Sequence, residues 1–165
     1  MALVVEDGTG LPNSNSLISV AELDSWADDR GYDLSAYTTA NKEAALITST
    51  LDFFEVFYTF KGDPLETDQA LQLPTDEVTI NAKIKQAAAQ AAYYQLQGTL
   101  LIDHTTSNTA EIKRLKEKID VIEEETEYVE DTRNTYRVKT PTIDKILAPY
   151  LVSGGGVFGG LYRGL

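Results

Sequence analysis

The sequence of 165 residues has no cysteine and contains one histidine, one methionine and one tryptophan. Without cysteine there is no disulfide framework and no thiolate metal site. The single histidine, His104, lies in a polar segment and has no second imidazole to share a zinc ion, so we expect no metal and no other cofactor. No apolar run approaches the length of a membrane span, and the first ten residues lack a secretory signal pattern. We therefore expect a soluble protein with no membrane partner.

Basic side chains are also scarce. The sequence has 14 Lys and Arg and 26 Asp and Glu, which gives a net charge of −12. Affinity for phosphate depends on Lys and Arg that release counterions, so this balance argues against a general nucleic-acid binder. The exception is 132–165, where five basic residues face Asp144 alone.

Helical spacing of apolar residues predicts three core helices. Ser19 begins a capping-box pattern, which predicts a first helix over about 20–30. Thr39 is a suitable N-cap for a second helix, which should end before residue 61, and a third is expected over about 79–98. The second carries an apolar stripe on one face, made of Ile47, Leu51, Phe54 and Tyr58 and widened by Phe53 and Phe57. The third is rich in alanine over 87–92, so we expect these two helices to pack closely.

The C-terminal third has a mixed pattern. Residues 112–122 fit either a helical seam or alternating strands, and the Thr, Tyr and Val content that follows favours a β-hairpin-like arm over much of 113–138. Pro141 opens a short helix to about residue 151, in which Pro149 should disfavour helical geometry for Ala148. The predicted fold is mainly α: a small helical bundle over 1–110, an extended arm over 111–140, and over 141–165 a short helix with a C-terminal docking tail.

The search for catalytic residues finds no supported set, so we expect no enzyme. A triad on His104 lacks a Gly-x-Ser-x-Gly serine, and the acidic stretch 28–33 does not match a calcium loop. The acidic run 123–127 is typical of a solvated face. Gly154, Gly156 and Gly159 spell a dinucleotide fingerprint, but no helix can follow so near residue 165.

The glycine-rich tail combines conformational freedom with large apolar side chains. A disordered terminus is the usual fate of such a segment, but Phe158, Leu161 and Tyr162 are costly to leave in water. We interpret the tail as a docking element.

Several motifs together carry a family resemblance. They are 6–10 with 15–16 and 19–22, 60–62 with 69–71 and 73–74, and 146–151 before the glycines. In order and spacing they resemble the head-to-tail adaptor, or head completion, proteins of tailed bacteriophages, a family in which some members are labelled DnaT-like single-stranded-DNA-binding proteins.

The resemblance implies a structural virion protein at the neck, made in the host cytoplasm, that forms a homo-oligomeric ring, typically a dodecamer, as a connector around the DNA ejection channel. Its partners would be the phage portal protein, a tail-side protein (tail terminator, stopper or nozzle), and DNA that passes through without sequence-specific binding. An acidic channel would repel DNA phosphates and let the genome slide. The implied portal interface is Leu147, Pro149, Tyr150, Leu151, Gly154, Gly155, Gly156, Val157, Phe158, Leu161, Tyr162 and Arg163. The implied tail-side or inter-subunit contacts of the arm are Ile119, Val121, Tyr128 and Tyr136.

The alternative hypothesis is a single-stranded-DNA-binding replication protein, as the second family label implies. It requires Lys and Arg side chains that contact the phosphates, and therefore an affinity for DNA that falls as the salt concentration rises. The net charge led us to rank it below the adaptor.

Overall fold

The computed structural model describes residues 2–101, 114–119, 122–126 and 140–152. The chain forms two compact units, one made of Met1–Leu101 with Val138–Leu165 and the other of Ile102–Arg137. We describe each unit by itself.

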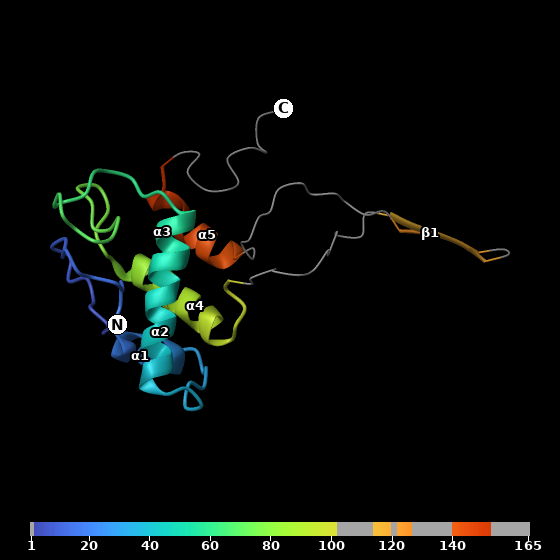
Figure 1. The fold of residues 1–165 in the computed structure, drawn as a ribbon, viewed down its shortest axis with the longest axis horizontal. Coiled ribbons are helices and arrows are strands. Elements are labelled where there is room, and N and C mark those ends of the chain that lie inside the picture. The colour runs from blue at the N-terminus through green and yellow to red at the C-terminus, as the bar shows by residue number, and fades with distance from the viewer. Residues whose placement is uncertain (1, 102–113, 120–121, 127–139, 153–165) are drawn as a thin grey trace. The chain divides into compact units, whose positions relative to one another are not determined.

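The first unit is helical, which confirms the mainly α prediction (Figure 1). No helix in the described part of the chain is long and apolar enough to cross a membrane. The helical elements are α1 (Val20–Asp28), α2 (Thr39–Thr48), the π-helical segment η1 (Ser49–Phe54), α3 (Glu55–Phe57), α4 (Ala82–Leu96), α5 (Pro141–Leu147) and the 3₁₀ turn η2 (Ala148–Tyr150).

Side-chain caps fix where the first helices begin. Ser19 accepts a hydrogen bond from the Glu22 amide, and the Glu22 carboxylate accepts one from the Ser19 amide, so the predicted capping box is present. At α2 the N-cap is Thr38, one residue before the predicted Thr39, because the side chain of Asn41 completes a second capping box there. Each cap satisfies amides that the helix itself leaves without a partner.

The π-helical segment rotates the buried face of the second helical stretch. A π turn takes more residues than an α turn, so the apolar stripe expected for a regular helix changes position at η1. Phe53, Phe54 and Tyr58 are buried as predicted, whereas Ile47 and Leu51 are half-buried. Residues that the spacing did not select complete the buried face, namely Ala45, Leu46, Ser49 and Thr50.

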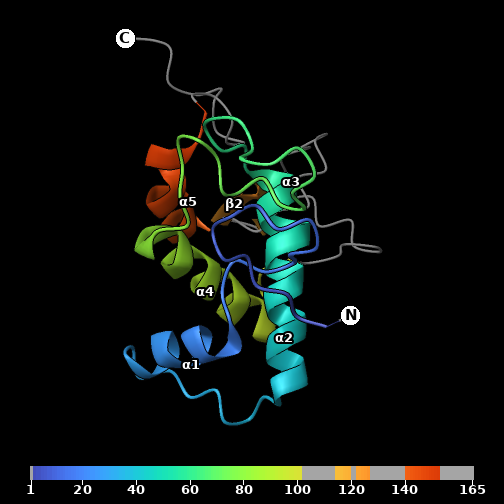
Figure 2. The same cartoon turned by 90° about the vertical axis from the view of Figure 1, so that its left-hand side faces the viewer.

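The alanine-rich helix α4 lies at the centre of the first unit. It contacts α1, α2, η1 and α5, and Figure 2 shows it between α1 and α5, beside α2. Five of its six alanines are almost fully buried, at positions 87, 88, 89, 91 and 92. Small side chains let backbones approach closely, and α4 packs against both α2 and η1, which confirms the predicted close packing of the second and third helices.

The C-terminal helix is part of this core, through buried Ile143 and Leu147. Ala148 has helical dihedrals (φ −45°, ψ −41°), although Pro149 was expected to disfavour them. The chain tightens there into the 3₁₀ turn η2, because two hydrogen bonds from Lys61 hold that turn. The Lys61 amide donates to the Tyr150 carbonyl (2.9 Å), and its ammonium group donates to the Pro149 carbonyl (2.8 Å).

A buried carboxylate organises the loop before α1. Glu6 is 4% exposed, and its two oxygens accept hydrogen bonds from four donors at 2.9–3.0 Å. Three are the amides of Gly8, Gly10 and Leu11, and the fourth is the Ser14 hydroxyl. A buried charge needs this degree of hydrogen bonding to offset its desolvation. The 6–10 motif therefore has a folding role.

The second unit contains β1 (Arg114–Ile119) and β2 (Ile122–Thr126), which pair antiparallel. Cα partners include Glu117 with Glu124 and Lys118 with Glu123, and the register is irregular between Arg114 and Leu115. The extended arm predicted over 113–138 lies largely outside the described residues and stays a prediction, as do the predicted domain boundaries.

Replacing Glu6 tests the role of the carboxylate. Glu6→Ala leaves four donors near a buried cavity, and because an unsatisfied buried group costs roughly 1–3 kcal/mol, we expect a decrease of about 3 kcal/mol or more in unfolding free energy. Urea denaturation followed by circular dichroism measures it. The neighbouring exposed carboxylate, Asp7→Ala, is the matched control and should change stability by less than about 1 kcal/mol. Equal decreases for the two variants would contradict the proposed role.

Glu55 predicts a pH-dependent stability. Burial raises the pKa of its carboxyl, and this outweighs the hydrogen bonds from Gln72, which act to lower it. A raised folded-state pKa contributes stability that is fully present below the unfolded pKa and is lost as the pH rises through the folded pKa. Glu55→Gln keeps an acceptor for the Gln72 amide without the charge. We expect its Tm at pH 7 to exceed that of the wild type by about 2–4 °C, and this gain to vanish near pH 4. A gain of equal size at both pH values would contradict this cause.

Candidate nucleic-acid interface

Three aromatic rings and one guanidinium group form a cluster at the surface of the first unit. We call Trp26, Arg30, Tyr32 and Tyr93 the aromatic cluster. Trp26 comes from α1, Arg30 and Tyr32 from the turn after it, and Tyr93 from α4. Gly31, between Arg30 and Tyr32, has φ +70°, a left-handed conformation that allows the chain to turn back directly after the helix.

The rings contact one another in a continuous set. Tyr32 and Tyr93 are stacked, with centroids 4.4 Å apart and ring planes inclined by 11°. Trp26 lies 5.6 Å from Tyr32 and 6.0 Å from Tyr93, in tilted arrangements. Trp26 is only 8% exposed, Tyr93 is half-buried and Tyr32 is 36% exposed. The cluster therefore has a buried floor, Trp26, and an outer ring, Tyr32, that solvent reaches.

The Arg30 guanidinium lies over the indole of Trp26, 4.5 Å from its centroid. Its Nη1 donates a hydrogen bond to the Trp26 carbonyl at 3.2 Å. This is a cation–π contact at an exposed residue, a geometry that contributes roughly 0.5–1 kcal/mol.

The indole Nε1 of Trp26 is a buried donor with no hydrogen-bond partner in the described part of the protein. Leaving such a donor unsatisfied costs about 1–3 kcal/mol. An acceptor supplied by a ligand would remove this penalty.

Acidic residues surround the cluster in the sequence. Asp28, Asp29 and Asp33 are exposed, and hydrogen bonds from the Ser35 hydroxyl and amide hold the pKa of Asp33 below its usual value. Arg30 is the only basic residue between positions 1 and 41. Within residues 1–41, Arg30 is therefore the one cation that could contact a phosphate group.

Two ion pairs hold α1 against its neighbours. Lys42 on α2 pairs with Asp24 at 2.6 Å, and Lys85 on α4 pairs with Glu22 at 2.6 Å. Partial burial acts to raise the pKa of Glu22, but the hydrogen bonds from Lys85 and Ser19 outweigh it and leave the pKa lowered. These pairs fix the helix that carries Trp26 and engage two of the unit's few cations.

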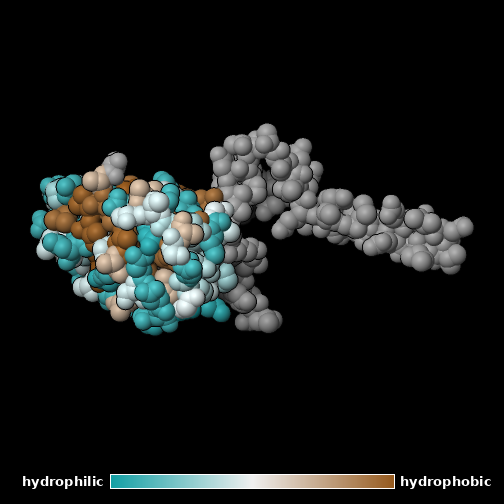
Figure 3. All heavy atoms as spheres, turned by 90° about the horizontal axis from the view of Figure 1, so that it is seen from below, coloured by the Kyte–Doolittle hydropathy of each residue, from teal (hydrophilic) through white to brown (hydrophobic). Residues whose placement is uncertain are grey.

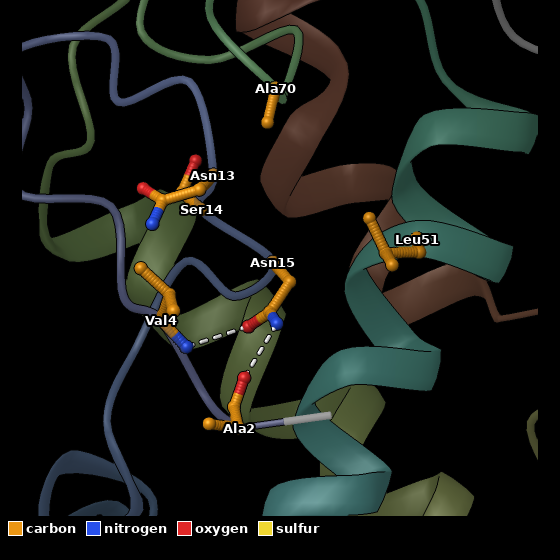
Figure 4. Close-up of a pocket in the computed structure, with 7 residues that line it drawn as sticks. All are labelled: Ala2, Val4, Asn13, Ser14, Asn15, Leu51 and Ala70. Carbon is orange, nitrogen blue, oxygen red and sulfur yellow. Dashed lines mark hydrogen bonds between the residues drawn. The ribbon is translucent and has the colours of Figure 1, made fainter.

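An open depression of about 510 Å³ lies beside the N-terminal segment (Figure 4). Its wall is partly apolar, with Val4, Leu51 and Ala70, and Asn15 ties it together by accepting from the Val4 amide and donating to the Ala2 carbonyl. Figure 3 shows apolar residues gathered in one brown area on the face seen from below, with hydrophilic residues over much of the rest. The depression is lined by no charged side chain and offers no catalytic group among the described residues.

The residues that the resemblance assigns to the portal interface differ in their burial, and many of them lie outside the described part of the chain. Leu147 is fully buried in the core, Pro149 is exposed, and Tyr150 and Leu151 are half-buried. Leu151 pairs with Phe60 in an isolated antiparallel bridge. Ile119 ends β1 opposite Ile122. The remaining assigned residues lie outside the described part of the chain: Gly154, Gly155, Gly156, Val157, Phe158, Leu161, Tyr162, Arg163, Val121, Tyr128 and Tyr136.

The candidates for a metal site come next. His104 lies outside the described residues. Within the described ranges, no group of three or more His, Asp or Glu side chains could hold a metal ion.

Comparison with known families gives a match that covers almost the whole chain. Residues 1–164 match the family described as "Putative DnaT-like ssDNA binding protein". The chain belongs to this DnaT-like family. No curated protein and no solved structure matches it.

Membership of the DnaT-like family corrects the expected function. The expectation of a virion connector, with a portal, a tail-side protein and DNA that passes through a ring, is wrong, because the matching family is described by single-stranded DNA binding. That description agrees with the alternative hypothesis. The error has a physical source: net charge is a property of the whole chain, whereas stacking on aromatic rings needs only a local surface.

The aromatic cluster was missed by sequence reasoning. Trp26 lies within the first predicted helix, and Arg30 and Tyr32 lie in the acidic stretch 28–33, which was compared only with a calcium loop. The available signal was an Arg-Gly-Tyr sequence directly after a helix that carries the only tryptophan.

Proposed function

We propose that this protein binds single-stranded DNA by stacking unpaired bases on the aromatic cluster. The observation that carries the proposal is the exposed Tyr32 ring, supported from behind by stacked Tyr93 and beside a guanidinium group. Membership of the DnaT-like family supports the same ligand. The role is one of binding, without a catalytic step.

Stacking suits a protein of this charge. A base stacked on an aromatic side chain contributes about 1–3 kcal/mol and tolerates any sequence, because every base has a π face. In a duplex the bases are already stacked and paired, so a single exposed ring has access mainly to unpaired ones. The surface therefore favours single strands over duplex.

The distribution of charge indicates where phosphate contacts would come from. Residues 1–101 hold five basic and fifteen acidic side chains, and two of the five cations are paired with Glu22 and Asp24. The stretch 113–118 holds four basic residues and one acidic residue. We propose in addition that this stretch, which lies within the predicted arm, supplies contacts to phosphates. These contacts would be separate from the stacking surface.

Removing the outer ring tests the stacking surface. Tyr32→Ala should weaken binding of a fluorescent oligo(dT) by about 5- to 150-fold, which corresponds to the removal of one stacked base. Fluorescence anisotropy at low salt measures the affinity, with a duplex of equal length for comparison.

The matched control is Tyr37→Ala, in the same connection between α1 and α2 and outside the aromatic cluster. Circular dichroism must show that both variants are folded. Oligo(dT) binding by Tyr32→Ala equal to that of the wild type would overturn the stacking site, and no binding by the wild type would overturn the proposed function.

Neutralising the basic stretch tests the phosphate contacts. Replacing Lys113, Arg114, Lys116 and Lys118 by Gln should weaken binding and reduce the salt dependence. For a single strand, the slope of log K against log salt decreases in magnitude by about 0.7 for every phosphate that the protein no longer neutralises. An unchanged slope would show that this stretch makes no phosphate contact.

A further inference from the structure

Arg30 occupies the position on Trp26 where a base would stack. Its guanidinium is 4.5 Å from the indole centroid, and Trp26 is otherwise enclosed by Tyr32 and Tyr93. With 8% of its surface exposed, Trp26 is not available to a ligand while Arg30 stays in place.

We infer that Arg30 is a displaceable cover: an incoming unpaired base takes its place over Trp26, and the freed guanidinium pairs with the phosphate of that nucleotide. This inference rests on the proposed function and adds a regulated second stacking position beneath the exposed Tyr32.

The contacts that hold Arg30 are weak enough to exchange. They are one hydrogen bond of 3.2 Å to a carbonyl and one exposed cation–π contact, worth roughly 0.5–1 kcal/mol. A stacked base contributes about 1–3 kcal/mol in the same position. A guanidinium group on phosphate gains charge-assisted, often bidentate hydrogen bonds, which are roughly twice as strong as neutral ones. The exchange is therefore favourable in both of its parts.

Local charge makes the displaced arginine necessary. Asp28, Asp29 and Asp33 are exposed near the cluster and repel phosphate. Asp24 is paired with Lys42 and Glu22 with Lys85, so neither cation is free to replace Arg30. A base bound over Trp26 thus brings its phosphate to a surface where Arg30 is the available countercharge.

Trp26 is the only tryptophan of the protein, so its fluorescence reports on this position alone. In the full-length protein without DNA, Arg30→Ala should increase acrylamide quenching of Trp26, because the cover is gone. In the wild type, oligo(dT) should change the Trp26 emission on binding. Lys83→Ala, which removes an exposed cation at the start of α4, is the control and should leave the quenching unchanged.

Salt titrations of oligo(dT) binding complete the test. Arg30→Ala should lower the salt slope by about 0.7 and weaken binding several-fold at low salt, and Arg30→Lys should restore the slope because it keeps the charge. If the wild type binds oligo(dT) but Trp26 emission and the Arg30→Ala slope do not change, the displaceable cover is wrong and the proposed function stands. If the wild type does not bind, both are overturned.

Discussion

The close approach of helices to α4 is the constraint on which the rest of the first unit depends. Because α4 presents alanines on its buried surface, α1, α2 and α5 can all lie against it. This brings the end of α1 near the C-terminal half of α4, so that Trp26 and Tyr93 meet although they are far apart in the sequence. A larger residue in the alanine series would separate these helices and, with them, the rings of the aromatic cluster.

Much of this packing could be predicted from the sequence. The capping box at Ser19 and the alanines of α4 are local signals, and both predicted the correct elements. The rotation of the buried face at η1 could not be predicted, because a π turn depends on tertiary packing and leaves the spacing of apolar residues looking like that of a regular helix. The helical conformation of Ala148 could not be predicted either, because the hydrogen bonds from Lys61 that hold η2 come from a distant part of the chain.

The candidate site was less predictable than the fold, for a reason that lies in its residues. Trp26 has the spacing of a core position in an amphipathic helix, and in the structure it is nearly buried. What makes the aromatic cluster a surface is the turn at Gly31, which places Arg30 over Trp26 and Tyr32 against Tyr93. Periodicity reports which face of a helix is apolar, but it contains no information on which residue of a following turn covers that face.

The net charge of the chain does not determine what one local surface can bind, for a related reason. A charge of −12 excludes binding that relies on a broad basic surface, and that conclusion holds for residues 1–101, whose cations are few and partly paired with carboxylates. It does not exclude a surface on which base stacking supplies the free energy of binding and one guanidinium group limits the repulsion between phosphates and carboxylates. On such a protein the acidic surroundings weaken attachment to phosphates in general, whereas a base that reaches an aromatic ring is unaffected by them. Acidity then favours ligands with accessible bases, which is a form of selectivity for single strands over duplex.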